Sequence, residues 1–285
     1  MSIIEKAIAK LNHAKQSNDD SGNEKSSQRK FEKTASSPHS DLQLKFNIET
    51  LSAAGIVSPN EQAPYLADEF RRIKRPLLNN AFGTSSELVE NGNVIMVTSS
   101  LPGEGKSFSA VNLALSIALE KDYTVLLIDA DVAMSKITRM FALDKRPGLT
   151  DKLENTELDL AELLIKTDFP GLSIIPAGKH TTLATELLSS NVMKDLIKEI
   201  ANRYSNRIII FDSPPLLATP ESSVLAEQMG QIVLVVEANK TPQSAVMESV
   251  GLLNKDKAIG VILNKTSKGF GYAQYGNYYS YGRGA

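Results

Sequence analysis

Residues 94–107 read Val-Ile-Met-Val-Thr-Ser-Ser-Leu-Pro-Gly-Glu-Gly-Lys-Ser, an apolar run followed by a glycine-rich turn. Small residues in such a turn let backbone N–H groups face a phosphate, and the positive end of the following helix dipole adds to the attraction. The lysine supplies a point charge toward the β- and γ-phosphates, and the serine hydroxyl is a Mg²⁺ ligand. The usual first glycine of the pattern is replaced by Ser100. The sequence therefore predicts a Walker A loop that binds a nucleotide through Pro102, Gly103, Glu104, Gly105, Lys106, Ser107 and Phe108.

Two further apolar runs carry aspartates where the predicted strands end. Residues 125–131 read Val-Leu-Leu-Ile-Asp-Ala-Asp, and residues 208–215 read Ile-Ile-Ile-Phe-Asp-Ser-Pro-Pro. The carboxyl ends of parallel strands meet at one edge of a sheet, so Asp129, Asp131 and Asp212 are expected beside the phosphate loop. Each aspartate taken singly is as consistent with a helix cap or a turn. The three together with the loop favour Mg²⁺-assisted phosphoryl chemistry.

The remaining pattern predicts an α/β fold of the P-loop NTPase type, with a mostly parallel sheet and helices on both faces. Strands that are apolar along their whole length are typical of a sheet buried on both sides. The expected strands are residues 94–98, 124–129, 172–176, 207–212, 232–236 and 259–263. The expected helices are residues 67–78, 106–120, 191–203, 221–228 and 243–254.

The chain divides into four parts by composition. Residues 1–13 place apolar side chains on one face of a short amphipathic helix. Residues 14–63 are expected to be a mostly disordered linker, because they cannot bury enough apolar surface to offset the entropy of ordering. Residues 64–265 form the expected P-loop domain, and residues 266–285 a flexible tail rich in glycine and tyrosine.

The composition excludes several classes of function. The chain has 285 residues, a net charge of −2, no cysteine and three histidines. Without cysteine there are no disulfides, no thiolate catalysis and no cysteine-ligated zinc, and a nearly neutral charge does not favour nucleic acid. No apolar run approaches the roughly 20 residues of a membrane helix. The sequence indicates a cytoplasmic protein whose membrane role requires a partner.

The three motifs together resemble the bacterial tyrosine kinases of exopolysaccharide synthesis, most of all those that accompany exosortase (XrtA/PEP-CTERM) export systems. The resemblance extends over about residues 65–285 and implies a protein-tyrosine autokinase that uses ATP and Mg²⁺. Lys106 and Ser107 would then bind the phosphates and the metal, and Asp131 and Asp212 would complete the metal shell. Asp129 is the favoured acceptor of the tyrosine proton, although the sequence leaves open which aspartate is the base.

Two other matches to this family concern assembly and base recognition. Glu69, Arg72 and Arg75 repeat the family's Glu-x-x-Arg-x-x-Arg helix, which implies a ring-like homo-oligomer in which each tail enters the next subunit. The same spacing also suits ion pairs on a solvated helix, worth about 0.2–0.5 kcal/mol each. Asn264 matches a residue that contacts the adenine edge, and a local turn explains it nearly as well. The family also implies a membrane-embedded polysaccharide chain-length-determinant activator that holds the chain at the inner face of the plasma membrane.

The sequence departs from this family at two places. Relatives often carry a basic residue soon after the second motif, whereas here residues 132–134 are Val-Ala-Met and the first positive charge is Lys136. Glu221 stands where an aspartate is common. Both departures concern the details of catalysis rather than nucleotide binding.

The tail holds five of the eight tyrosines of the chain, which are the expected phosphate acceptors: Tyr272, Tyr275, Tyr278, Tyr279 and Tyr281. Interleaved glycines let the tail reach the active site of a neighbour. Each phosphate adds about −1.5 to −2 charges, so phosphorylated tails would repel one another and leave a ring. The alternative is a sticky low-complexity tail or an aromatic stretch that binds sugar or RNA, and the scarcity of nearby basic residues argues against RNA.

Two other functions share the phosphate loop. A ParA/MinD-type ATPase that positions cargo has the same sheet, but that class carries a lysine early in its loop, where this chain has Leu101, and lacks a tyrosine-rich end. A non-catalytic regulator would use ATP only to switch an interaction surface of an export complex, and no motif excludes it.

Overall fold

A computed structural model of the chain describes residues 44–46, 51, 55–56, 64–83 and 88–266. The amphipathic helix expected at residues 1–13 and the tail tyrosines lie outside these residues. Within them, the expected P-loop architecture is confirmed.

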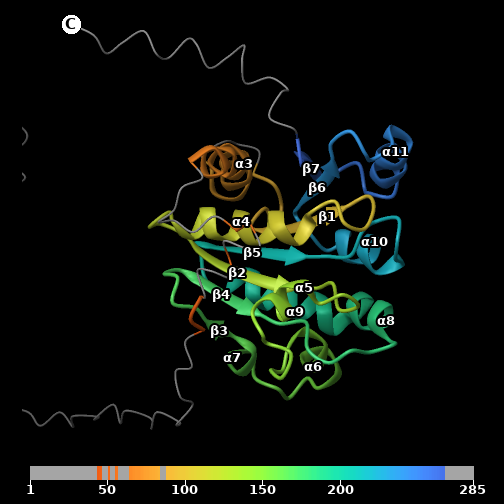
Figure 1. The fold of residues 1–285 in the computed structure, drawn as a ribbon. Helices are drawn as coiled ribbons and strands as arrows, with labels where there is room; N and C mark the ends of the chain where they lie inside the picture. The colour runs from red at the N-terminus through yellow and green to blue at the C-terminus, as the bar shows by residue number, and fades with distance from the viewer. Residues whose placement is uncertain (1–43, 47–50, 52–54, 57–63, 84–87, 267–285) are drawn as a thin grey trace, which may run out of the picture. The chain divides into compact units, whose positions relative to one another are not determined.

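A seven-stranded sheet forms the centre of the fold, in the order β3-β4-β2-β5-β1-β6-β7 (Figure 1). The strands are β1 (Val94–Ser99), β2 (Thr124–Asp129), β3 (Ile165–Lys166), β4 (Leu172–Ile175), β5 (Arg207–Asp212), β6 (Gln231–Glu237) and β7 (Ala258–Asn264). Every neighbouring pair is parallel except β3 with β4. All residues of β1 are buried, as its apolar sequence predicts.

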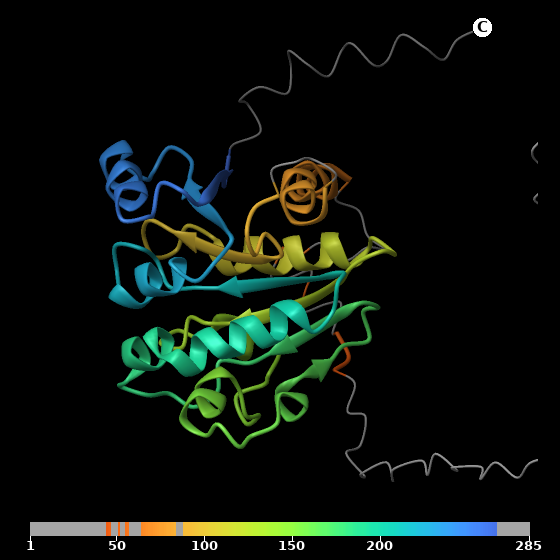
Figure 2. The same ribbon diagram turned by 180° about the vertical axis from the view of Figure 1, so that it is seen from behind.

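Helices cover both faces of this sheet. They are α3 (Pro64–Phe82), α4 (Lys106–Ala118), α5 (Lys136–Met140), α6 (Leu149–Glu154), α7 (Leu160–Leu163), α8 (Ala184–Ser189), α9 (Asn191–Asn202), α10 (Pro220–Ala226) and α11 (Gln243–Gly251). Side chains of α3 and α4 pack into one core cluster and those of α8, α9 and α10 into another. Seen from behind, α9 runs along the face of the sheet opposite to α4 (Figure 2).

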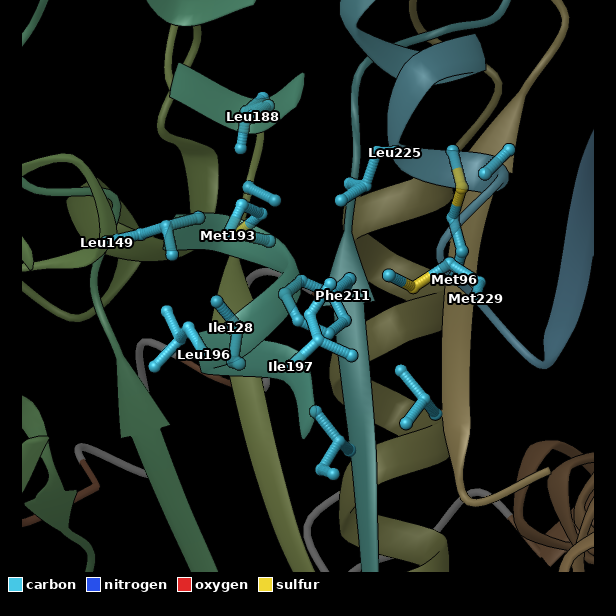
Figure 3. Close-up of a cluster of buried hydrophobic side chains, with 14 of the residues drawn as sticks. Met96, Ile128, Leu149, Leu188, Met193, Leu196, Ile197, Phe211, Leu225 and Met229 are labelled. Carbon is cyan, nitrogen blue, oxygen red and sulfur yellow. The ribbon is translucent and has the colours of Figure 1, made fainter. Parts of the chain in front are cut away.

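The core on the α9 face is built from alternate residues of the strands. Phe211 of β5 and Ile128 of β2 are fully buried there, and they meet Met193, Leu196 and Ile197 of α9 (Figure 3). The preceding residue in each strand, Ile210 in β5 and Leu127 in β2, points to the other face and belongs to the core on the α4 face. Both faces are therefore apolar, which explains why the strands lack polar alternation.

The expectation that every strand is buried on both sides is wrong for β7. Val261 and Leu263 are 59% and 60% exposed. The physical reason is position, because β7 is the edge strand of the sheet and has β6 as its single partner. The neighbouring α11 contributes a single buried residue, Ser249, so it covers little of this strand.

The range 14–63 expected to be a linker contains residues that pack on the domain. The Leu44 N–H donates to the Lys166 carbonyl over 2.8 Å, and the Leu44 carbonyl accepts from the Asp168 N–H over 2.9 Å. Leu51 and Ile56 are 5% and 2% exposed in the core on the α4 face. Leu51 and Ile56 therefore already belong to the domain core although they precede residue 64, because burial of their apolar side chains offsets the entropy of ordering them.

Among the helices that the structure describes, none is both long enough and apolar enough to span a bilayer.

Candidate nucleotide-binding and phosphoryl-transfer site

The phosphate loop connects the most buried strand of the sheet to the start of α4. β1 lies between β5 and β6, and Lys106 is the first residue of α4. Gly103 and Gly105 adopt positive φ angles of 87° and 102°, which favour glycine over other residues. A Cβ on Gly105 would lie 2.1 Å from Nδ2 of Asn264, so any other residue there would displace this amide from its bond to the Glu104 carbonyl.

Three charged residues predicted from separate motifs meet beside this loop. Lys106 Nζ lies 2.6 Å from Asp131 Oδ2 and 3.7 Å from Asp212 Oδ1. All three side chains are at most 6% exposed. The register of the sheet explains the meeting, because Asp129 at the end of β2 pairs directly with Asp212 at the end of β5.

Burial and neighbouring charges change the proton affinities of this cluster. Burial alone would lower the pKa of Lys106, but Asp212 and Asp131 raise it above its usual value. Burial raises the pKa of Asp212, against the opposing effect of Lys106. Lys136 also favours the charged form of Asp212, so the first positive charge after the second motif acts on the site despite its shifted position.

Asp129 is held differently from the other two aspartates. Its Oδ2 accepts a hydrogen bond from the Thr138 backbone N–H over 2.8 Å and another from the Thr138 hydroxyl over 2.7 Å. Burial, followed by the negative charge of Asp212, raises the pKa of Asp129 to about 7, although the Thr138 hydrogen bonds oppose the shift. Thr138 lies in α5 and was missed by sequence reasoning, because its contact with Asp129 joins residues in different elements.

The charges and free oxygens of the cluster fit a divalent cation with nucleotide phosphates. Three carboxylates face one lysine, and both oxygens of Asp212 and Oδ1 of Asp129 are buried without a hydrogen bond from the described residues. A cation with oxygen ligands compensates such a charge. In the described part of the chain, no group of three or more His, Cys, Asp or Glu side chains could hold a metal by itself. Mg²⁺ typically binds through one or two carboxylates together with substrate phosphates.

The ends of β6 and β7 support the loop from the other side. Asn264 Nδ2 donates to the Glu104 carbonyl over 2.8 Å, and Lys265 Nζ donates to the Gly103 carbonyl over 2.7 Å. The buried Glu104 carboxylate accepts from the Leu101 N–H over 2.7 Å and from the Thr241 hydroxyl. Asn264 thus lies at the loop with its amide nitrogen bonded to protein, and its contact with the adenine edge stays a prediction. Sequence reasoning missed the roles of Lys265 and Thr241, and the only signal was their place just after strand ends.

The predicted loop residues play unequal parts. Pro102 and Gly103 are exposed, whereas Ser107 is buried at the start of α4. The Phe108 ring packs against Phe70 of α3, with ring centroids 6.4 Å apart, so this side chain belongs to the core on the α4 face.

The predicted assembly residues lie on α3, away from the aspartate cluster. Arg72 and Arg75 are exposed and Glu69 is partly buried. Between them, Lys74 is buried and its Nζ donates to the Ser116 carbonyl over 2.6 Å. Ser116 belongs to the last turn of α4, at the end opposite to Lys106.

Comparison with known proteins gives matches to kinases. A family described as an AAA domain matches residues 92–255. Tyrosine-protein kinase YwqD of Bacillus subtilis (strain 168) is 30% identical over 82% of this chain and 97% of YwqD. Tyrosine-protein kinase CpsD of Streptococcus agalactiae is 32% identical over 72% of this chain and 88% of CpsD. Tyrosine-protein kinase ptk of Acinetobacter johnsonii is 35% identical, and this chain spans 22% of its length.

Solved structures of kinase domains are also similar to this chain. The kinase domain of VpsO is 34% identical, with a TM-score of 0.56, over 71% of this chain and 100% of that chain. The kinase domain of the Escherichia coli tyrosine kinase ETK is 25% identical, with a TM-score of 0.60, over 76% of this chain and 88% of that chain. The septum site-determining protein MinD of Pyrococcus horikoshii OT3, at 23% identity and a TM-score of 0.50 over 59% of this chain and 68% of that chain, shares the fold alone. With matches over nearly the full length of YwqD and CpsD, the chain belongs to the bacterial tyrosine-protein kinase family.

Proposed function

We propose that this chain is an ATP-dependent autokinase that transfers the γ-phosphate of ATP to tyrosines of its own C-terminal tail. The observation that carries the proposal is the buried cluster in which Lys106, at the start of α4, lies against Asp131 and Asp212. Relatives that are named tyrosine-protein kinases support the same reaction.

The loop between β1 and α4 binds the nucleotide in this proposal. The phosphates lie against the loop N–H groups, and Lys106 turns from Asp131 toward the β- and γ-phosphates. That movement frees Oδ2 of Asp131, which with Asp212 and the Ser107 hydroxyl would hold Mg²⁺. When bound, Mg²⁺ supplies positive charge that offsets the negative charge of the phosphates. Asn264, beside Gly105, keeps an amide oxygen with which to contact the adenine edge.

Asp129 is the group that we assign to the tyrosine proton. A free tyrosine hydroxyl has a pKa of about 10, so a positioned base assists it as it attacks. A carboxyl with a pKa of about 7 is suited to exchange protons near neutral pH. The tyrosine oxygen bonds to the γ-phosphorus while the bond from that phosphorus to the β–γ bridging oxygen breaks. The phenolic proton passes to Asp129, and ADP leaves.

The acceptors and the assembly complete the proposal. Tyr272, Tyr275, Tyr278, Tyr279 and Tyr281 lie outside the described residues, so their role rests on the sequence. In a ring-like homo-oligomer, the exposed Arg72 and Arg75 of α3 would contact the next copy, whose site receives the tail. Phosphates on several tails repel one another and favour release from the ring.

The cellular role that we propose is regulation of exopolysaccharide synthesis and export. It includes a membrane-embedded chain-length-determinant partner that activates the kinase at the inner face of the plasma membrane. This part rests on the family resemblance, as does the narrower assignment to the exosortase-associated branch.

Incubation of the purified chain with Mg-ATP, followed by blotting for phosphotyrosine, tests the proposal. We expect a signal from the wild type, none from Lys106→Met, and little from a variant with all five tail tyrosines changed to Phe. Tyr204→Phe is the matched control, because Tyr204 is an exposed tyrosine outside the tail. ATP hydrolysis without phosphotyrosine would instead support a ParA/MinD-like switch, and nucleotide binding without turnover would support a non-catalytic regulator.

A further inference from the structure

We propose that Thr138 is a positioning residue, which fixes Asp129 so that one carboxylate oxygen is held by protein and the other is presented to the reacting tyrosine. The inference rests on the proposed kinase function and specifies how this aspartate is prepared for it. Neither the sequence motifs nor the comparisons assign a role to Thr138.

The two hydrogen bonds from Thr138 converge on the same oxygen of Asp129. The backbone N–H and the side-chain hydroxyl both donate to Oδ2, over 2.8 Å and 2.7 Å. Asp129 Oδ1 is buried and accepts no hydrogen bond from the described residues. Two donors on one oxygen oppose rotation of the carboxylate, because a rotated group would lose one or both bonds. The free oxygen is therefore fixed in direction.

The direction of the hydroxyl bond is set by a third residue. The Ala177 backbone N–H donates to Thr138 Oγ1 over 2.8 Å. Since that oxygen already accepts a hydrogen bond, its own proton is free to point at Asp129, and a carboxylate can only accept. The chain of donors runs from Ala177 through Thr138 to Asp129, and all three residues are at most 5% exposed. Burial strengthens such a chain, because no water competes for its members.

The other two aspartates of the cluster are arranged for different tasks. Asp131 uses both carboxylate oxygens, with Oδ2 on Lys106 and Oδ1 accepting from the Met134 N–H over 3.1 Å. Asp212 accepts no hydrogen bond on either oxygen from the residues that the structure describes, and it lies 3.7 Å from Lys106. Within the cluster, Asp129 is the carboxylate with one oxygen anchored by neutral donors and one oxygen free. This asymmetry is what a directed proton acceptor requires.

Thr138→Val tests the role of the hydroxyl. Valine keeps the shape of threonine and leaves the backbone N–H in place, so the losses are the hydroxyl bond to Asp129 and the bond that Oγ1 accepts from the Ala177 N–H. We expect kcat for tyrosine phosphorylation to fall about tenfold to a hundredfold, the effect of one hydrogen bond to a charged group. KM for Mg-ATP should change less than about twofold, because Thr138 does not belong to the phosphate loop. Thr138→Ser, which keeps the hydroxyl, should restore kcat to within about threefold of wild type.

Thr167→Val is the matched control for removing a buried threonine hydroxyl. Thr167 is 5% exposed, and its hydroxyl lies 2.9 Å from the Leu172 carbonyl and 3.0 Å from the Phe169 carbonyl, near the start of β4 and so at the amino end of the strands. We expect it to leave kcat unchanged. An equal loss of kcat in Thr167→Val and Thr138→Val would overturn the proposal.

A double-mutant cycle with Asp129→Asn asks whether Thr138 acts through Asp129. In the Asp129→Asn background, Thr138→Val should cause no further loss of kcat, because the base is already absent. The same fractional loss in both backgrounds would contradict a positioning role.

A readout without turnover separates this inference from the proposed function. Crystal structures of the wild type and of Thr138→Val should show the Asp129 carboxylate rotated in the variant. An unrotated carboxylate would overturn the inference even in an active kinase. A wild type without phosphotyrosine would refute the proposed function, while the two structures would still decide whether Thr138 holds Asp129.

Discussion

At the residue scale, the molecule concentrates like charges where water is excluded. Asp129, Asp131 and Asp212 are at most 1% exposed, and Lys106 is the neighbouring cation that pairs with two of them. Buried charges are costly unless they are paired, so the cluster is stable through Lys106 and through protons taken up by carboxylates with raised pKa values. Repulsion among the three carboxylates suits a site that binds a nucleotide together with a divalent cation, because the cation offsets their negative charge.

Lys106→Met should destabilise the nucleotide-free protein as well as abolish activity. Removal of the lysine leaves Asp131 and Asp212 without the cation that pairs with both of them, and we expect the free energy of unfolding to fall by about 3 kcal/mol at pH 8. The loss should be smaller at pH 5 than at pH 8, because the raised pKa of the buried Asp212 favours proton uptake as the pH falls. Urea denaturation at both pH values measures this. Lys145→Met, at an exposed position, is the control and should change stability by less than about 0.5 kcal/mol.

Asp129 should make the stability of the nucleotide-free chain depend on pH. Its pKa is raised from 3.8 to about 7, so between these values the folded chain holds a proton that the unfolded chain has released. The free energy of unfolding should therefore fall as pH rises through this range, with a slope of up to about 1.4 kcal/mol per pH unit. Asp129→Asn lacks this proton and should flatten the curve. A variant curve as steep as that of the wild type would show that other groups cause the slope.

At the element scale, the phosphate loop is held by the strands that end around it. The end of β7 supplies Asn264, and the following Lys265 adds a second bond to the loop carbonyls. The Glu104 side chain binds the loop N–H of Leu101 and reaches Thr241 after β6. The loop shape therefore depends on three strands and not on its own sequence alone.

Gly105→Ala should disturb this arrangement. The new Cβ would lie 2.1 Å from Asn264 Nδ2, and the φ angle of 102° is strained for alanine. We expect a loss of stability of about 1–3 kcal/mol and weaker binding of Mg-ADP. Thermal unfolding and calorimetric titration measure the two effects. Gly251→Ala is the control, because a Cβ there meets nothing within 4 Å, and alanine should be neutral or stabilising at the end of α11. If both variants lost the same stability and affinity, the close approach of Asn264 to Gly105 would not explain the effect at residue 105.

At the scale of the whole molecule, α3 faces two environments. Lys74 points inward and binds both the Ser116 carbonyl and Glu120, over 2.6 Å and 2.7 Å. Arg72 and Arg75 on either side are exposed. The helix α3 thus holds the C-terminal end of α4 through Lys74 and presents the positive charges of Arg72 and Arg75 to solvent. The proposed subunit contact therefore lies on a helix that packs against α4, which begins at the phosphate loop.

On α3, we expect Lys74 to affect the stability of the fold, and Arg72 and Arg75 to affect assembly of the oligomer. Lys74→Met should lower the free energy of unfolding by about 1–3 kcal/mol, because a buried carbonyl loses a charged donor. The pair Arg72→Ala and Arg75→Ala should leave the stability of the monomer within about 0.5 kcal/mol and abolish the oligomer. Urea denaturation and sedimentation velocity measure the two properties. An intact oligomer in the arginine variant would show that the exposed charges serve only solvation.

Much of the fold could be predicted because its signals are local. The strands expected at residues 124–129 and 207–212 have the same bounds in the structure, since runs of β-branched and aliphatic residues favour buried strands. Prediction failed for β3, which has two residues, and for α5 to α8, which are at most six residues long. Such short elements carry too few residues to show a period. The helix expected at residues 67–78 is longer in the structure, where α3 continues through Pro76 to Phe82.

The sequence by itself determined the phosphate loop, the three aspartates at strand ends and the parallel sheet, because each is a pattern within about ten consecutive residues. Only the tertiary structure decided which groups face one another. It placed Asp131 rather than Asp129 on Lys106, joined Thr138 to Asp129 and Ala177, engaged Asn264 with the loop, and left β7 at an edge. These contacts join residues far apart in the chain, and their partners are selected by strand order and register, which no local pattern contains.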